Sequence, residues 1–186
     1  MNEKWLNEYF NLYKNCLFNK SINNQIIKLK NELQVVHKKG GKTMAMGNGA
    51  SASIASHIST DLSKGANIRT SNFNDANLIT ALSNDYGYEN WMAKAIEIYG
   101  DPGDIAILIS SSGSSENVIK AASTAKNMKI KVVTFSGFST NNPLKQSGEI
   151  NFWVDSKAYN IIENIHMIWL TAVCDSIIGK AEYSVN

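Results

Sequence analysis

Apolar side chains in the first forty positions recur at the spacing of an α-helix. They repeat every three or four residues over residues 3–39, and no alternating strand pattern occurs there. This period predicts two helices, with Ser21 as the cap between them and Gly40-Gly41 as the end of the second.

From residue 43 onward, short apolar runs of strand length alternate with helix-compatible segments. The expected strands cover residues 43–47, 68–73, 104–109, 131–135 and 149–154, and helices are expected at 50–62, 76–82, 91–99, 116–127, near Leu144 and at 159–178. Such alternation is typical of a parallel sheet covered on both faces by helices. The pattern predicts one α/β domain over residues 1–186, with N-terminal helices in 1–40 and the α/β core in 41–186.

Two turns between a predicted strand and the following helix carry candidate chemistry. The first, Gly47-Asn48-Gly49, precedes Ser51 at the start of a helix. Free N–H groups and the positive end of a helix dipole suit a phosphate there. An ordinary tight turn with Ser51 as a helix cap explains the same residues equally well, because Ala52 stands where a dinucleotide fingerprint needs glycine.

The second turn shifts this balance toward a phosphate site. It reads Ser-Ser-Ser-Gly-Ser-Ser over residues 110–115, which places five hydroxyl groups and a glycine directly after a buried-type strand. The carboxyl ends of parallel strands meet at one edge of an α/β sheet, where ligands bind. The two turns together therefore predict one anion site.

Titratable residues stand near these turns or on the last helix. His57 and Asp61 are four residues apart and share a helix face, which places a base and a carboxylate beside the first turn. Glu163 and His166 are three apart on the last helix, where a satisfied polar pair at a helix interface is the simpler explanation. The segment 83–88 is rich in turn formers, and it is either a surface turn or a source of acceptors for sugar hydroxyls.

The last predicted helix, residues 159–178, is apolar nearly all round. A helix of this kind must be covered on more than one side, which indicates contacts between subunits. Glu163, His166 and Asp175 interrupt the apolar run, so the helix is a poor membrane span.

Composition narrows the class of protein further. A net charge of +2 with scattered basic residues gives no support for a nucleic-acid surface. Cys16 and Cys174 are far apart and lack metal-ligand spacing, which fits a reducing compartment. The first residues lack the apolar core of a signal peptide, and a cytoplasmic protein is therefore expected.

Four motifs, in this order and spacing, resemble the SIS (sugar isomerase) domain family. They are GNGAS at 47–51, SNDYGY at 83–88, ISSSGSSENVIKA at 109–121 and IENIH at 162–166. Within that family the chain is most similar to the phosphoheptose isomerases, which interconvert sedoheptulose 7-phosphate and a heptose 7-phosphate. The resemblance implies a flavodoxin-like three-layer sandwich, a homotetramer with sites between subunits, zinc as cofactor, and heptose supply for lipopolysaccharide or capsule.

The resemblance also implies residue roles. The hydroxyls of one group would hold phosphate and sugar, and a second group would line the same site: Ser51, Ser110, Ser111, Ser112 and Ser115, then Asn48, Gly49, Asn84 and Asp85. A metal on His57, Asp61 and Glu163 would polarise the carbonyl oxygen, with Glu163 also near the substrate. Asp61 would be the base that moves a proton between adjacent carbons.

Three positions depart from the pattern of that family. Asp61 stands where the family has a glutamate, and Glu163 where it has a glutamine. Thr171 replaces a histidine that binds zinc and acts in proton transfer. The missing acid is then His166 or a bound water. An isomerase is the first hypothesis, and Thr171 motivates the alternative, a non-catalytic sugar-phosphate sensor or a tetrameric protein-binding adaptor.

Overall fold

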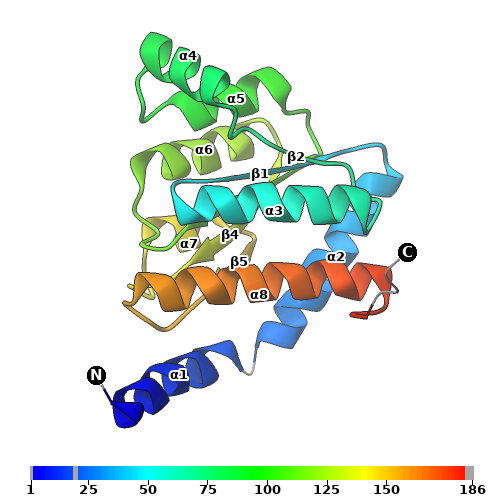
Figure 1. Ribbon diagram of the computed structural model, residues 1–186. Coiled ribbons are helices and arrows are strands. Elements are labelled where there is room, and N and C mark those ends of the chain that lie inside the picture. Colours follow the sequence, from blue (N-terminus) through cyan, green and yellow to red (C-terminus); the bar gives the residue numbers. More distant parts are fainter. Residues whose placement is uncertain (1, 19–20, 183–186) are drawn as a thin grey trace.

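The computed structural model describes residues 2–18 and 21–182. Five strands alternate with helices after two N-terminal helices (Figure 1). The elements are α1 (Glu3–Leu17), α2 (Ile22–Lys38), β1 (Thr43–Gly47), α3 (Ala50–Lys64), β2 (Thr70–Asn72), α4 (Ala76–Tyr86), α5 (Trp91–Tyr99), β3 (Ile105–Ser110), α6 (Glu116–Asn127), β4 (Lys131–Ser136), α7 (Pro143–Ser147), β5 (Ile150–Trp153) and α8 (Tyr159–Ile178).

The strands form one parallel sheet in the order β2-β1-β3-β4-β5. This is the flavodoxin-like order, and it confirms the predicted fold class. The chain leaves β1 toward one edge for β2 and returns to the other side for β3. The loops after β1 and β3 therefore diverge at their carboxyl ends, and this crevice is where open α/β sheets bind ligands.

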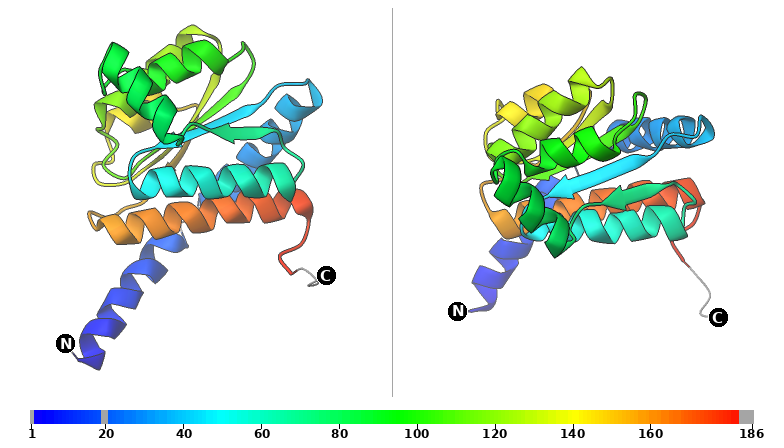
Figure 2. Two further views of the ribbon diagram at one scale, coloured as in Figure 1. Left: turned by 45° about the horizontal axis from the view of Figure 1, so that its top comes forward. Right: turned by 90° about the horizontal axis from the view of Figure 1, so that it is seen from above.

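Helices α2, α3 and α8 cover one face of the sheet. Successive strand residues point to opposite faces, so Ile105, Ile107 and Ile109 of β3 pack into this layer. Their neighbours Ala106 and Leu108 pack into the second layer, which α5, α6, α7 and Leu82 of α4 complete. Figure 2 shows the sheet between the two helical layers. All six residues of β3 are buried, so this strand is covered by a helical layer on each face.

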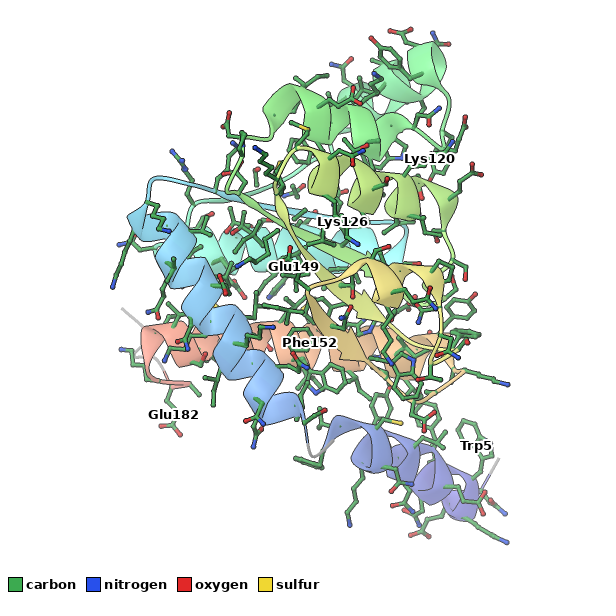
Figure 3. All side chains as sticks on the ribbon, turned by 180° about the vertical axis from the view of Figure 1, so that it is seen from behind. Trp5, Lys120, Lys126, Glu149, Phe152 and Glu182 are labelled. Carbon is green, nitrogen blue, oxygen red and sulfur yellow. The ribbon has the colours of Figure 1, made fainter. Side chains whose placement is uncertain are left out.

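The two N-terminal helices differ in their relation to the core. Leu29, Leu33 and Val36 of α2 are buried against α8 and β5, so α2 belongs to the sandwich. By contrast α1 has no buried residue, and it projects from the body of the domain (Figures 1 and 2). Figure 3 shows Trp5 out on α1 and Phe152 in the interior. Only α1 is therefore an extension beyond the core.

The structure corrects two local predictions. The first turn of segment 83–88 is helical, because α4 runs on to Tyr86 and ends where Gly87 adopts a φ of +87°. Ser51 is not a helix cap, because Gly49 holds that position and Ser51 lies inside the first turn of α3 with 3% of its surface exposed. The Ser51 hydroxyl therefore does not cap α3, in contrast to the ordinary tight turn considered as the alternative.

Among the described residues, α8 alone is long and apolar enough by composition to cross a membrane. Eight of its residues are buried within the domain, and it packs along α2 and α3. Its apolar character is thus explained in part by its place in the sandwich. Ile168 on its outer side is 42% exposed, so the helix is not fully covered by its own chain.

Candidate active site

The turn after β1 is shaped by two glycines with different roles. A Cβ at Gly47 would lie 2.6 Å from the Cβ of Ser51 and 2.9 Å from the carbonyl oxygen of Ile109, so only glycine lets these segments approach. Gly49 takes a φ of +56°, and a Cβ there would meet nothing within 4 Å. Gly47 therefore brings the start of α3 against the end of β3, and Gly49 turns the chain into the helix.

The turn after β3 supplies a cluster of hydroxyl groups. Ser110 is buried, and its Oγ lies 3.1 Å from Oγ of Ser115, the first residue before α6. Ser112 Oγ accepts a hydrogen bond of 3.2 Å from the backbone N–H of Ser114. These contacts fold the loop back on itself and hold its hydroxyls at the N-terminus of α6, the positive end of that helix.

A cavity of about 150 Å³ lies between the two turns. Its lining includes seven of the predicted site residues together with one apolar and one aromatic side chain: Asn48, Ser51, Ser110, Ser111, Ser112, Ser115 and Glu163, with Ile109 and Tyr159. The α3 and α6 N-termini both lie beside it. Hydroxyls and two helix N-termini around one hollow are suited to a phosphate group.

A larger hollow of about 400 Å³ lies at the opposite ends of the strands. Its walls come from the amino ends of β3 and β4, from α2 and from the end of α6, and they carry both lysines and carboxylates. Lys131 there pairs with Glu32 at 2.5 Å. This hollow lacks the hydroxyl loops and stands apart from the crevice where the topology favours a ligand.

Asn48 is held by two residues that the sequence did not single out. Its amide and that of Asn117 exchange two hydrogen bonds of 2.9 and 3.0 Å, and the Tyr88 hydroxyl donates to Asn48 Oδ1 at 3.1 Å. Asn117 is buried and also accepts from the backbone N–H of Val118. The pair ties the β1–α3 turn to α6. The only sequence signal was the position of Asn117 in the first turn after the serine loop.

Glu163 brings a carboxylate to the cavity from α8. Its Oε1 accepts a hydrogen bond of 3.3 Å from the Ser111 hydroxyl at the end of β3. Tyr159, one turn earlier on α8, lines the same hollow. Glu163 is half-buried there, and its position in the second turn of α8 points it toward the carboxyl ends of the strands.

His57 and Asp61 pair with each other but lie outside this cavity. His57 Nε2 is 3.0 Å from Asp61 Oδ2, and their side chains are 55% and 40% exposed. Ten residues of helix separate Asp61 from Ser51, which corresponds to about 15 Å along α3. The pair is partly exposed, and Asp61 lines a separate hollow between α3 and the end of α8, together with Cys174 and Ile178.

The predicted metal ligands do not form one group within the chain. No cluster of three or more His, Cys, Asp or Glu side chains that could hold a metal ion occurs in residues 2–18 and 21–182. Glu163 is thus separate from the His57–Asp61 pair. The Thr171 hydroxyl donates to the backbone carbonyls of Met167 and Ile168, as a helix threonine commonly does. The donor set of one chain does not fit zinc.

Asn84 and Asp85 lie on the exposed last turn of α4 and do not line the cavity. The amide of Asn84 donates to Asp85 Oδ1 at 3.0 Å. Their segment reaches the site through Tyr88, whose hydroxyl donates to Asn48. A role for Asn84 and Asp85 in sugar binding remains a prediction.

His166 is not placed to act as the missing acid. Its ring is fully buried between Phe135 and Trp169, and Nε2 lies 3.1 Å from the backbone carbonyl oxygen of Ser136. Burial lowers the pKa of this histidine from its ordinary value of 6.5 to about 4, against the smaller opposite effect of the Ser136 carbonyl. A neutral ring in the core contacts neither solvent nor the cavity. The burial of His166 gives no support for proton donation to a substrate in this cavity, and that role stays a prediction.

The buried ring predicts a loss of stability in mild acid. The unfolded chain protonates His166 below pH 6.5 and the native chain only below about pH 4. The stabilising contribution is therefore complete above pH 6.5 and is lost as the pH falls toward 4. Between pH 7 and pH 5 it amounts to about 2 kcal/mol. Urea unfolding at both pH values should show this drop, and His166→Phe should lack it; equal pH dependence in both proteins would contradict the prediction.

A family model described as the SIS domain matches residues 8–137 of the chain. The chain is 35% identical over 144 residues to a phosphoheptose isomerase of Helicobacter pylori (strain HPAG1), which covers 74% of each chain. It is also 35% identical over 146 residues to a phosphoheptose isomerase of Shewanella sp. (strain ANA-3), again over 74% of each.

Two solved structures share the architecture. The phosphoheptose isomerase of Francisella tularensis superposes with a TM-score of 0.87 at 26% identity, over 97% of this chain and 100% of that one. The phosphoheptose isomerase of Neisseria gonorrhoeae gives a TM-score of 0.76 at 28% identity, over 84% and 86% of the two chains. The first of these likenesses spans nearly the whole of both chains.

Proposed function

The chain belongs to the SIS domain family, among the phosphoheptose isomerases, and on this premise we propose that it interconverts sedoheptulose 7-phosphate and a heptose 7-phosphate. The observation that carries the proposal is the cavity between the β1 and β3 turns, which combines a hydroxyl cradle with a single carboxylate. Relatives named as isomerases favour the enzyme over the sensor or adaptor alternative.

The hydroxyl cradle is the part that would bind phosphate. Ser51, Ser110 and Ser115 offer donors beside the N-termini of α3 and α6. Each helix end adds backbone N–H groups and partial positive charge, which favour a dianion without a lysine or arginine in the cavity. The rest of the substrate would then extend along the side where Tyr159 and Glu163 lie.

The reaction moves a proton between neighbouring carbons by way of an enediolate. It needs a base near the two carbons and donors near the carbonyl oxygen. The serine hydroxyls and the Asn48 amide are the donors that the cavity offers. Asp61, the predicted base, lies outside the cavity of its own chain and would have to act in a neighbouring copy.

A homotetramer with sites between subunits is part of the proposal. Two features support it: the outer side of α8 exposes Ile168, and α1 exposes Trp5, Leu6, Phe10 and Leu12 without burying any residue. Covering such apolar area is favourable at about 25 cal/mol per Å². The half-exposed His57–Asp61 pair lies on a neighbouring surface, where a second copy would meet it.

Zinc remains a prediction that the fold of one chain does not support. The three predicted ligands are not gathered, and no step of the proposed reaction uses a metal. A zinc ion, where bound, would polarise the substrate oxygen.

We further propose a cytoplasmic protein that supplies heptose for a surface polysaccharide, lipopolysaccharide or capsule, in line with the relatives' activity.

A panel of sugar phosphates tests the proposed function. Nuclear magnetic resonance should show conversion of sedoheptulose 7-phosphate, with at least about tenfold lower kcat/KM for five- and six-carbon ketose phosphates, a ratio that corresponds to about 1.4 kcal/mol. The sensor alternative predicts a different outcome: a ligand that prefers the native state would raise Tm without any turnover.

A further inference from the structure

Among the residues that the structure describes, one carboxylate and no imidazole line the cavity. Of its nine lining residues, five are serines, and the others are Asn48, Ile109, Tyr159 and Glu163. Serine, asparagine and an ordinary tyrosine do not accept a proton from carbon at neutral pH, because their own conjugate acids or hydroxyl groups titrate far from that range. Glu163 is therefore the one group of the cavity with the chemistry of a base.

The other candidates lie elsewhere. Asp61 is about 15 Å along α3 from Ser51, where it is paired with His57 and lines a different hollow beside the end of α8. His166 is buried in the core on the carbonyl oxygen of Ser136. Neither lines the hollow of its own chain in which the serine cradle would fix the phosphate, and Asp61 would reach that hollow only from a neighbouring copy.

Ser111 fixes the direction of the Glu163 carboxylate. Its hydroxyl donates to Oε1 at 3.3 Å, which leaves Oε2 without a hydrogen-bond donor from the described residues. Ser111 is itself 6% exposed and directly follows β3, and its carbonyl oxygen accepts a hydrogen bond of 2.8 Å from the backbone N–H of Gly137, directly after β4. A carboxylate oriented in this way by a residue held at the edge of the sheet meets the requirement for a positioned base.

We propose that Glu163 is the base that moves the proton between C1 and C2, in the same chain that holds the phosphate. This assignment rests on the proposed function. It gives Glu163 a catalytic role, whereas the family resemblance implied only that Glu163 binds substrate and metal. It also accounts for a carboxylate at a place where the family has an amide, in a chain that has Thr171 in place of the family histidine.

The Glu163 carboxylate removes a proton from C1 of the ketose, the C–H electron pair forms the C1–C2 double bond, and the C2 carbonyl pair moves to O2. The O1 proton then passes to O2 through a hydroxyl or water. The O1 electron pair forms the C1 carbonyl as C2 takes the proton from Glu163, which returns to the carboxylate.

Glu163→Gln tests this assignment, because the amide keeps the shape and removes the base. We expect turnover of sedoheptulose 7-phosphate to fall by at least about a thousandfold, within the range that general base catalysis supplies, with Kd changed by less than about threefold. Glu163→Asp should retain measurable turnover. In deuterium oxide the wild type should incorporate deuterium at the reacting carbons, and Glu163→Gln should not.

Controls separate this proposal from the proposed function. Glu97→Gln removes an exposed carboxylate on α5 that pairs with Lys94 and does not line the cavity, and it should keep wild-type turnover. A wild type without turnover would refute the proposed function. A wild type with turnover, combined with Glu163→Gln that keeps more than a tenth of it, would overturn the role of Glu163. Loss of turnover in Asp61→Asn but not in Glu163→Gln would assign the base to Asp61 and overturn it as well.

Discussion

Replacing Ser51 by aspartate is expected to weaken the binding of sugar phosphates by at least about a hundredfold. Ser51 is 3% exposed and faces the cavity from the first turn of α3. A carboxylate there would stand close to the phosphate, and two like charges 4 Å apart repel by about 4 kcal/mol at an effective dielectric constant of 20. Titration calorimetry with sedoheptulose 7-phosphate measures the change.

Ser53→Asp is the matched control for this substitution. Ser53 lies on the same turn of α3 and is exposed, so the same negative charge is added at the helix N-terminus without entering the cavity. We expect its affinity to change by less than about fivefold, since exposed charges are screened. Equal weakening by both variants would show that the phosphate does not lie against Ser51.

Gly113→Ala should destabilise the native state by roughly 3 kcal/mol, as the sum of left-handed strain and lost buried hydrogen bonds. Gly113 has a φ of +66°, and a Cβ there would lie 2.0 Å from Oδ1 of Asn142. Asn142 is 2% exposed; its amide donates to Ser136 Oγ at 3.1 Å, and its Oδ1 accepts from the N–H of Lys145 as the cap of α7. The clash cannot be relieved without breaking these bonds.

Gly103→Ala is the control for Gly113→Ala, because it introduces the backbone strain of a positive φ without a steric clash. Gly103 has a φ of +94°, and a Cβ there would meet nothing within 4 Å. Its replacement should cost only the backbone strain, about 1 kcal/mol. Urea unfolding of both variants gives the comparison, and a Gly113→Ala protein as stable as Gly103→Ala would contradict the packing described around Asn142.

The sheet could be predicted from the sequence because its central strands β1, β3 and β4 are buried on both faces. A run such as that of β3 cannot be a half-exposed strand, and the alternation with helical segments then leaves a parallel sheet as the simplest arrangement. The end of α4 was missed, since Ser83, Asn84 and Asp85 are common turn formers, and only the positive φ of Gly87 shows where the helix stops.

The serine loop and the first turn could be found from the sequence because both follow strands directly. Parallel strands bring their carboxyl ends together whatever lies between them in the chain. The Asn48–Asn117 pair could not be found in this way, as its two amides belong to different loops and neither residue type is diagnostic. A spacing of three residues likewise placed His166 and Glu163 on neighbouring positions of α8. In the structure His166 nevertheless points into the core, whereas Glu163 lines the cavity.

The measurement that tests the central claim most directly is conversion of sedoheptulose 7-phosphate by chelator-treated protein, followed by nuclear magnetic resonance with and without added zinc. The phosphoheptose isomerase of Helicobacter pylori serves as the positive control. We expect aldose 7-phosphate to form in the chelated sample, because the cavity holds its own base. An unchanged ketose in both samples, while the control converts it, would contradict the isomerase account. Conversion only with zinc would support an isomerase but contradict the metal-free step.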